Sequence, residues 1–277
     1  MAQSLFDRPP YLEKFGLKEP PYSTNPDERF LFLSSNHHEA LAMVARVITN
    51  HEGAALIYGE KGTGKTTIMR RLYSEMHDEP DQFHVARIEA AEHCPTPFQL
   101  VKEVIEAFGG ECRANNRKDR FDQLKAILLE DFKNGITPVL LIDEAQQLET
   151  QALESLRGYL NFETARAKVL QIVLFAMPSI VRKLSFVPSL KNRLIRTELE
   201  RLDKAEMIEM LRWRFTQAGG KVFPFDDQSL ERLYALVGGH PRSTCGVAQI
   251  ALEVAGLRNT FVTDEIISQA ATRRFVD

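Results

Sequence analysis

The feature that most constrains this chain is a glycine-rich segment that follows an apolar run and precedes a helical pattern. Residues 54–66 read AALIYGEKGTGKT, with the spacing Gly59-x4-Gly64-Lys65-Thr66. In such a loop, successive backbone N–H groups point at phosphate oxygens, the lysine adds a positive charge, and the threonine hydroxyl can ligate Mg²⁺. About one chain in a hundred of this length would show the bare pattern by chance. We therefore predict a nucleoside triphosphate site, formed by Gly59, Glu60, Lys61, Gly62, Thr63, Gly64, Lys65, Thr66 and Thr67.

Composition sets broad limits on what the chain does. With 277 residues, of which 44% are hydrophobic, the chain can bury one large core and a smaller one. No apolar run approaches the ~20 residues that span a bilayer, and the N-terminus does not resemble a signal peptide. The net charge of −3 argues against indiscriminate coating of nucleic acid but allows a local basic surface. The cysteines show no metal or disulfide spacing, which favours a reducing cytoplasm; they are Cys94, Cys112 and Cys245.

The order of secondary-structure patterns predicts an α/β fold. Strand patterns lie at 54–58, 84–90, 139–143, 171–177 and 197–202, separated by helical patterns at 65–76, 97–108, 119–133 and 150–163. Such alternation is typical of a parallel sheet with helices on both faces. From residue 203 onward the pattern is wholly helical. We expect an extended N-terminal segment (1–35) packed on the nucleotide-binding body, a nucleotide-binding α/β domain (36–202) and a small helical lid (203–277).

A second acidic motif completes the predicted nucleotide site. Residues 139–144 read VLLIDE, a buried-strand pattern that ends in Asp143 and Glu144. At the carboxyl end of a strand, Asp143 can hold Mg²⁺, and Glu144 can polarise an attacking water molecule. The sequence contains no Asn-Lys-x-Asp motif for reading guanine and no recognisable pocket for a phosphate acceptor. ATP hydrolysis is therefore favoured over GTP hydrolysis or a kinase reaction.

These motifs, with a Leu-x-x-Arg stretch at 190–193 and GGHPR at 238–242, follow in the order of an AAA+ ATPase, which the chain resembles. The opening, with FGLKEPPY at 15–22, NPD at 25–27 and HEAL at 38–41, is similar to the ExeA/GspA branch. That branch also supplies modules to transposition regulators of the TnsC and TniB kind. The resemblance covers essentially the whole chain and implies an AAA+ P-loop NTPase with a C-terminal helical lid.

The resemblance implies three further roles. Arg193 matches the arginine finger, which reaches the γ-phosphate of a neighbouring subunit, although Arg196 and Arg201 compete for that role. Arg242 matches the sensor arginine of the lid. Where the family carries a polar sensor after the fourth strand, this chain has Met177, which suggests slow or partner-dependent hydrolysis.

A finger supplied in trans implies head-to-tail self-assembly into a ring or a filament. The first functional hypothesis is a TnsC-like regulator that assembles with ATP on the backbone of duplex DNA and bridges a target-selection protein to a transposase. A basic stretch at 112–120, expected to be a loop between two helices, would contact phosphates together with the turn at Thr96. The candidate DNA contacts are Thr96, Arg113, Asn116, Arg117 and Lys118.

Two alternatives remain open. One is a secretion ATPase resembling ExeA, in which the module is followed by a membrane helix and a wall-binding domain; this sequence contains neither. The other is a DNA-independent ATPase that remodels a protein client, for which an aromatic pore loop is expected after the second strand and is not evident. His37, His38 and His51 lack a fourth ligand for a metal and are expected to be packing or surface residues.

Overall fold

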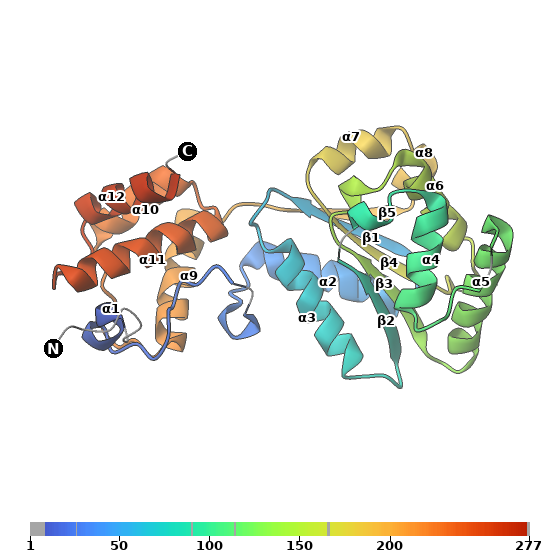
Figure 1. Ribbon diagram of the computed structural model, residues 1–277, viewed down its shortest axis with the longest axis horizontal. Helices are drawn as coiled ribbons and strands as arrows, with labels where there is room; N and C mark the ends of the chain where they lie inside the picture. Colours follow the sequence, from blue (N-terminus) through green and yellow to red (C-terminus); the bar gives the residue numbers. More distant parts are fainter. Residues whose placement is uncertain (1–8, 26, 90, 114, 165–166, 276–277) are drawn as a thin grey trace. The chain divides into compact units, whose positions relative to one another are not determined.

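The computed structural model describes residues 9–25, 27–89, 91–113, 115–164 and 167–275. These residues form two compact units (Figure 1). Residues 35–200 make up one unit. The described residues before 35 join those from 201 onward in the other. Each unit has its own hydrophobic core.

The unit of residues 35–200 is built on a parallel sheet of five strands in the order β2-β3-β4-β1-β5, which confirms the predicted α/β class. Its edge strand β5 begins earlier than expected, because Leu194 and Ile195 pair with Ala54 and Ala55 of β1. The strands are β1 (Ala54–Gly59), β2 (Phe83–Ile88), β3 (Thr137–Ile142), β4 (Gln171–Ala176) and β5 (Leu194–Leu199).

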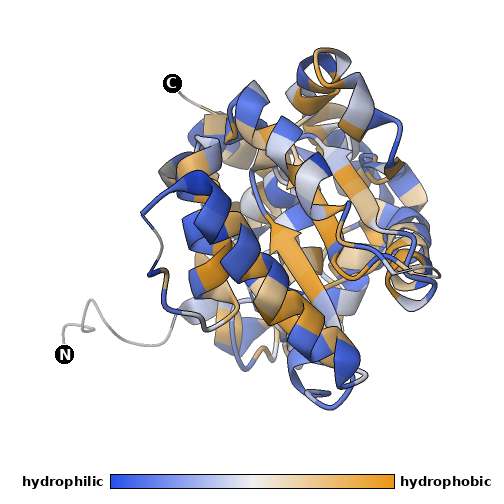
Figure 2. Cartoon of the chain, turned by 90° about the vertical axis from the view of Figure 1, so that its right-hand side faces the viewer, coloured by the Kyte–Doolittle hydropathy of each residue, from blue (hydrophilic) through white to orange (hydrophobic). Residues whose placement is uncertain are grey.

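Alternate side chains of each strand enter different cores because successive residues of a strand point to opposite faces. On β1, Ala54 and Leu56 belong to one core, whereas Ala55 and Ile57 belong to the other. Both faces are covered, so the three central strands, β1, β3 and β4, are almost continuously apolar (Figure 2).

The helices divide between the two faces of this sheet (Figure 1). The face that contains Ile57 is covered by α2 and α3. The face that contains Leu56 is covered by α4 to α8. These helices are α2 (Ser35–Thr49), α3 (Lys65–His77), α4 (Pro97–Ala107), α5 (Arg117–Lys133), α6 (Thr150–Tyr159), α7 (Ser179–Ser185) and α8 (Pro188–Lys191); short 3₁₀ turns are η2 (Ala91–His93) and η3 (Ala145–Gln147).

The second unit is helical and includes the N-terminal segment. Tyr22 is fully buried in its core, and its hydroxyl donates to the Leu211 carbonyl at 3.1 Å. The Lys14 ammonium donates to the Ala255 carbonyl at 3.2 Å, near the end of the longest helix of this unit. The elements are α1 (Pro10–Lys14), η1 (Glu28–Phe30), α9 (Lys204–Gln217), α10 (Asp227–Val237), α11 (Pro241–Leu257) and α12 (Asp264–Phe275).

The placement of the N-terminal segment differs from expectation. We expected residues 1–35 to be extended and to pack on the α/β body. Instead, α1 is helical, and its apolar side chains pack in the core formed by α9 to α12. The aromatic residues that suggested a packed segment are the reason, because they supply large side chains to a small helical core. Residues 1–8 lie outside the described residues.

In the described part of the chain, no helix combines the length and apolarity needed to cross a membrane.

This packing can be tested at Gly256 in α11, where a Cβ atom would lie 2.5 Å from Tyr11 Cβ and 2.7 Å from Tyr11 Cα. Gly256→Ala should destabilise this unit by about 1–3 kcal/mol, because the backbone of α1 would have to move. Gly246→Ala on the same helix is the matched control. Its Cβ would meet only the end of the flexible Arg274 side chain, so a small effect is expected. Thermal unfolding of both variants measures the difference, and equal melting temperatures would contradict the observed α1–α11 packing.

Candidate nucleotide site

The predicted phosphate loop connects β1 to α3 and is shaped by close backbone contacts. A Cβ atom on Gly59 would lie 2.5 Å from the Leu199 carbonyl of the neighbouring strand β5. Gly64, which precedes α3, has φ 100°, and a Cβ there would lie 2.9 Å from His37 Nε2. These two positions therefore require glycine. The loop leads into the N-terminus of α3, where free backbone N–H groups favour an anion.

Lys65 is folded over the loop in this structure. Its ammonium donates to the carbonyls of Gly59 and Glu60, each at 2.8 Å. Burial lowers the pKa of Lys65, and the nearby Glu144 and Asp143 carboxylates oppose that effect. The positive charge is therefore held at the centre of the loop, where phosphate oxygens would replace the carbonyl acceptors.

Thr66 and Asp143 meet although 77 residues separate them. The Thr66 hydroxyl donates to Asp143 Oδ2 at 2.7 Å, and the Glu144 backbone N–H donates to Asp143 Oδ1 at 2.9 Å. Asp143 is only 3% exposed, and this burial raises its pKa despite both hydrogen bonds. A hydroxyl and a buried carboxylate at this separation are hard oxygen ligands of the type that Mg²⁺ prefers. The donor set therefore fits the predicted cation.

Glu144 follows β3 in a strained conformation. Its backbone has φ 51° and ψ 36°, a left-handed region that residues other than glycine adopt at a cost. Its half-buried carboxylate accepts a hydrogen bond from the Gln146 side-chain amide. The turn therefore directs Glu144 away from the strand, at the same sheet edge as Lys65 and Asp143.

Arg193 lies at the opposite edge of the sheet from the phosphate loop. It precedes β5, whose first residue Leu194 pairs with Ala54 at the start of β1, whereas the loop follows Gly59 at the end of β1. Six strand residues at ~3.3 Å each separate these edges by about 20 Å. The exposed Arg193 guanidinium donates to Asn161 Oδ1 at 2.6 Å. Since no arginine side chain spans such a distance, Arg193 is not part of the phosphate site of the same chain.

The two remaining positions for which the resemblance predicts a sensor lie in different units. Arg242 is exposed on the first turn of α11, in the helical unit. Met177 follows β4 in the α/β unit, and its backbone N–H donates to Gln146 Oε1 at 2.9 Å. The polar contact at position 177 therefore comes from the backbone.

The candidate DNA contacts form a different arrangement from the one expected. Helix α5 begins at Arg117, so only part of 112–120 is a loop. Asn116 caps α5, and Thr96 caps α4 in a capping box, so both polar side chains already have structural partners. Arg120 is buried: its guanidinium lies 3.6 Å from the Phe98 ring centroid and donates to the Phe98 carbonyl at 2.9 Å. The contact between Arg120 and Phe98 accounts for the early start of α5, and it brings the starts of α4 and α5 together.

The basic side chains at these helix starts remain accessible. Arg117 and Lys118 are exposed on the first turn of α5, and Arg113 is exposed in an ion pair with Glu111. The structure therefore assigns the Thr96 and Asn116 side chains to helix capping, and the contact of these five residues with DNA stays a prediction.

Two residues of the site were not recognised from the sequence. His37, expected to be a packing or surface residue, is 4% exposed, and its Nε2 lies 2.8 Å from the Thr63 carbonyl of the phosphate loop. Gln146 contacts both Glu144 and Met177. No motif spacing marks His37, because it approaches the loop from α2. Gln146 directly follows the acidic pair and Ala145, and its position there was the only available signal. The described residues contain no cluster of metal-binding side chains.

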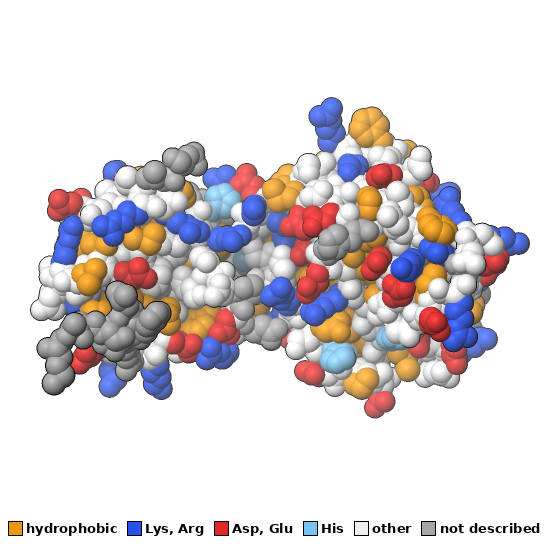
Figure 3. Space-filling model, in the orientation of Figure 1, with side chains coloured by type: hydrophobic (Ala, Val, Ile, Leu, Met, Phe, Trp, Pro, Cys, Tyr) orange, Lys and Arg blue, Asp and Glu red, His pale blue; other side chains and the backbone are white. Residues whose placement is uncertain are grey.

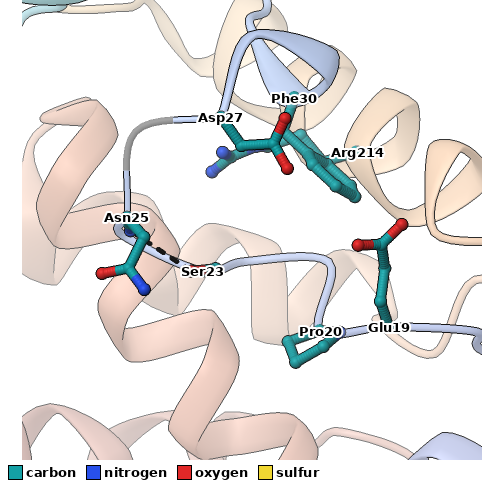
Figure 4. Close-up of a pocket in the computed structure, with 7 residues that line it drawn as sticks. All are labelled: Glu19, Pro20, Ser23, Asn25, Asp27, Phe30 and Arg214. Atoms are coloured by element: carbon teal, nitrogen blue, oxygen red, sulfur yellow. Dashed lines mark hydrogen bonds between the residues drawn. The ribbon is translucent and has the colours of Figure 1, made fainter.

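The helical unit contains a separate cavity of ≈ 460 Å³ (Figure 4). Arg29 pairs with Glu19 and Asp27 beside it, at 2.9 and 2.6 Å. The hydrogen bond from Arg29 lowers the pKa of Asp27. None of the predicted nucleotide-binding residues lines this cavity; its lining residues are Glu19, Pro20, Ser23, Asn25, Asp27, Phe30 and Arg214.

Comparison with known proteins identifies related sequences. Residues 48–184 match the family model described as an AAA domain. General secretion pathway protein A of Aeromonas hydrophila is 31% identical over 258 residues, which cover 90% of this chain and 46% of that protein. Replication factor C small subunit 2 of Pyrobaculum islandicum is 20% identical over 215 residues, covering 78% of this chain and 57% of the relative. The chain thus spans about half the length of these curated relatives.

Solved structures share the fold at lower sequence identity. The ORC2 protein of Aeropyrum pernix superposes with a TM-score of 0.66 at 18% identity, covering 94% of this chain and 72% of that structure. The ORC1 protein of the same organism, solved in complex with DNA, gives a TM-score of 0.62 at 18% identity, with 88% and 66% covered. Domain III of DnaA from Thermotoga maritima gives 0.57 at 17% identity, with 94% and 98% covered.

The role of the phosphate loop can be tested at Lys65. We expect Lys65→Ala to weaken ATP binding by about a hundredfold, because the variant loses the charge-assisted contacts to phosphate oxygens. Equilibrium titration with a fluorescent ATP analogue measures the affinity, and thermal unfolding checks the fold. Lys102→Ala, at an exposed position on α4, is the control and should bind normally. Equal affinity in both variants would exclude the loop from nucleotide binding.

Proposed function

We propose that this protein is a Mg²⁺-dependent ATPase that self-assembles through its nucleotide site, because residues 48–184 match the model of an AAA domain and the chain has a P-loop NTPase fold. The observation that carries this proposal is the separation of the charged groups. Lys65, Asp143 and Glu144 lie at one edge of the sheet, whereas Arg193 lies at the other. One subunit would therefore carry the phosphate-binding groups at one edge of its sheet and the proposed arginine finger at the other edge.

The chemistry follows from the groups at the first edge. Backbone N–H groups of the loop and the Lys65 ammonium would bind the phosphates, and Thr66 and Asp143 would hold Mg²⁺, which would offset the phosphate charge. Glu144, fixed just beyond β3, accepts a proton from the water that attacks the γ-phosphate. Arg242 of the helical unit is proposed to sense the bound nucleotide.

In the proposed assembly, the edge that carries Arg193 contacts the phosphate-loop edge of the next copy. Helix α7 follows β4 at the phosphate-loop edge, and α7 and the turn after it expose Val181 (38%) and Phe186 (69%). Figure 3 shows hydrophobic and basic side chains next to one another over α7. Such a head-to-tail contact repeats without limit or closes into a ring, depending on the rotation. ATP would lie at each junction and so control assembly.

We further propose that the assembly forms on duplex DNA and regulates transposition, as the opening motifs suggest. The starts of α4 and α5 lie together, and each N-terminus attracts anions. The exposed Arg113, Arg117 and Lys118 side chains add positive charge there. A few phosphate contacts per subunit would form a continuous track when repeated along an assembly. The ORC1 relative was solved with DNA.

The three free cysteines are consistent with action in a reducing cytoplasm, where a transposase and a target selector would dock.

A secretion role is the second candidate, and the 31% identity to general secretion pathway protein A supports it. That role needs no contact between the chain and DNA, so DNA binding separates the two candidates.

Imaging by negative-stain electron microscopy with a slowly hydrolysed ATP analogue tests the assembly and its partner. We expect ordered decoration of duplex DNA that requires the analogue. Replacing Arg113, Arg117 and Lys118 by alanine should abolish decoration and reduce the salt-dependence slope of DNA binding by up to about three, one for each lost phosphate contact.

A charge-matched control uses exposed lysines elsewhere on α4 and α5; these are Lys102, Lys125 and Lys133. That variant should decorate DNA normally. Rings that form equally with and without DNA would favour a protein remodeller. An unchanged salt-dependence slope in the triple alanine variant would exclude the three basic residues from DNA contact.

Arg193→Ala tests the contribution of one subunit to the site of another. ATP affinity of the isolated subunit should be unchanged, while turnover under assembling conditions should fall by about a hundredfold or more. Mixing experiments give the sharpest measurement. Arg193→Ala subunits have an intact phosphate loop, and Lys65→Ala subunits have an intact Arg193, so mixtures should regain turnover that neither variant has alone. Wild-type turnover by Arg193→Ala would assign the finger to another arginine.

A further inference from the structure

Gln146 connects the carboxylate of Glu144 to the end of the neighbouring strand. Its side-chain Nε2 donates to Glu144 Oε2, and its Oε1 accepts from the Met177 backbone N–H at 2.9 Å. Met177 directly follows β4, which pairs with β3. A single side chain therefore joins the residue proposed to activate water to the strand where a polar sensor would be expected.

The orientation of the Gln146 amide is determined by its partners. A backbone N–H can only donate, so the oxygen of the amide must face Met177. The NH₂ group must then face Glu144, which accepts when it is ionised. Reversing the amide would place two donors together at Met177 and two acceptors together at Glu144. The network therefore has one satisfied arrangement.

The turn that contains Gln146 is also fixed from a second direction. The Lys183 ammonium, on α7, donates to the backbone carbonyls of Gln146 at 2.6 Å and of Leu148 at 2.8 Å. These bonds hold the backbone of η3 while the Gln146 side chain reaches across to β4. The Glu144 carboxylate is thus attached to a turn that cannot rotate freely, with one of its oxygens occupied.

We propose that Gln146 is a positioning residue for Glu144 and carries out the link to β4 that a polar side chain at position 177 would otherwise provide. Gln146 leaves Glu144 Oε1 to accept a proton from water and fixes its direction. A shift of the β4 end moves the Met177 N–H and, through Gln146, the carboxylate. This inference rests on the proposed hydrolysis of ATP with Glu144 as the base.

Two substitutions separate positioning of Glu144 from a merely structural tie. Gln146→Glu has the same shape and still accepts from the Met177 N–H, but it cannot donate to Glu144 when ionised. Gln146→Met removes both hydrogen bonds at similar volume. We expect both variants to lower kcat by about tenfold or more, with KM and ATP-analogue affinity within about twofold of wild type, because a hydrogen bond to a charged group is lost. Gln147→Met, at the exposed neighbouring position, is the control and should retain wild-type kcat.

A purely structural role of Gln146 predicts different kinetics for the two variants. If Gln146 only ties η3 to β4, Gln146→Glu should behave as wild type while Gln146→Met loses activity or stability. Wild-type kcat in both variants, or a rise in kcat, would also refute positioning.

A measurement without turnover keeps this inference separate from the proposed function. In protein labelled with ¹⁵N-glutamine, the side-chain amide signal of Gln146 is assigned as the one missing from Gln146→Met. We expect Glu144→Ala to shift that signal and to accelerate its hydrogen exchange, since the amide loses its acceptor. An unchanged signal overturns the inference whether or not ATP is hydrolysed. A shifted signal together with wild-type protein that never hydrolyses ATP would support the contact and refute the ATPase proposal.

Discussion

The hydrogen bond between the Thr66 hydroxyl and the Asp143 carboxylate is the contact on which the candidate site depends. It joins Thr66, at the end of the phosphate-loop motif that follows β1, to the residue after β3, and β4 lies between β1 and β3 in the sheet. The contact is possible only because parallel strands bring their carboxyl ends to a common edge. Asp143 remains buried there with a raised pKa, which is costly for an ionised carboxylate unless a cation accompanies it. The fold thus creates an edge that favours positive charge, to which the Lys65 ammonium contributes.

Much of this edge could be predicted from the sequence because its residues belong to compact motifs. The phosphate loop and the acidic pair each follow a run of apolar residues, and the period of those runs identifies strands whose ends must lie together. The sheet and its flanking helices follow from the same alternation. What the motifs do not encode is the support of the loop. His37 reaches Thr63 from a helix that precedes β1, and no local spacing specifies that approach.

The departures from expectation share a physical origin in tertiary packing. The N-terminal segment was expected on the α/β body because its prolines and aromatic residues indicated a packed, extended chain. Its Tyr11 and Tyr22 side chains instead belong to the core of the helical unit. Likewise, the run at 112–120 contains charges typical of a loop, yet Arg120 is buried against Phe98 and extends α5 toward its N-terminus. In both cases, side chains pack against partners that are distant in sequence, and those contacts override the local pattern.

Met177 shows how a missing side chain can be compensated by the backbone. A methionine cannot orient a carboxylate, but its N–H is as good a donor as any other and is fixed by the strand that precedes it. The Gln146 side chain accepts from that N–H and donates to Glu144, so β4 is linked to the carboxylate through one side chain and not directly to the phosphate. Such a link responds to small displacements of β4, because both of its hydrogen bonds must stay short. In the proposed assembly, a neighbouring copy that docks its Arg193 at this edge would act on a carboxylate already coupled to the sheet. Arrival of that copy, and not ATP binding alone, would then determine when the bond to the γ-phosphate breaks.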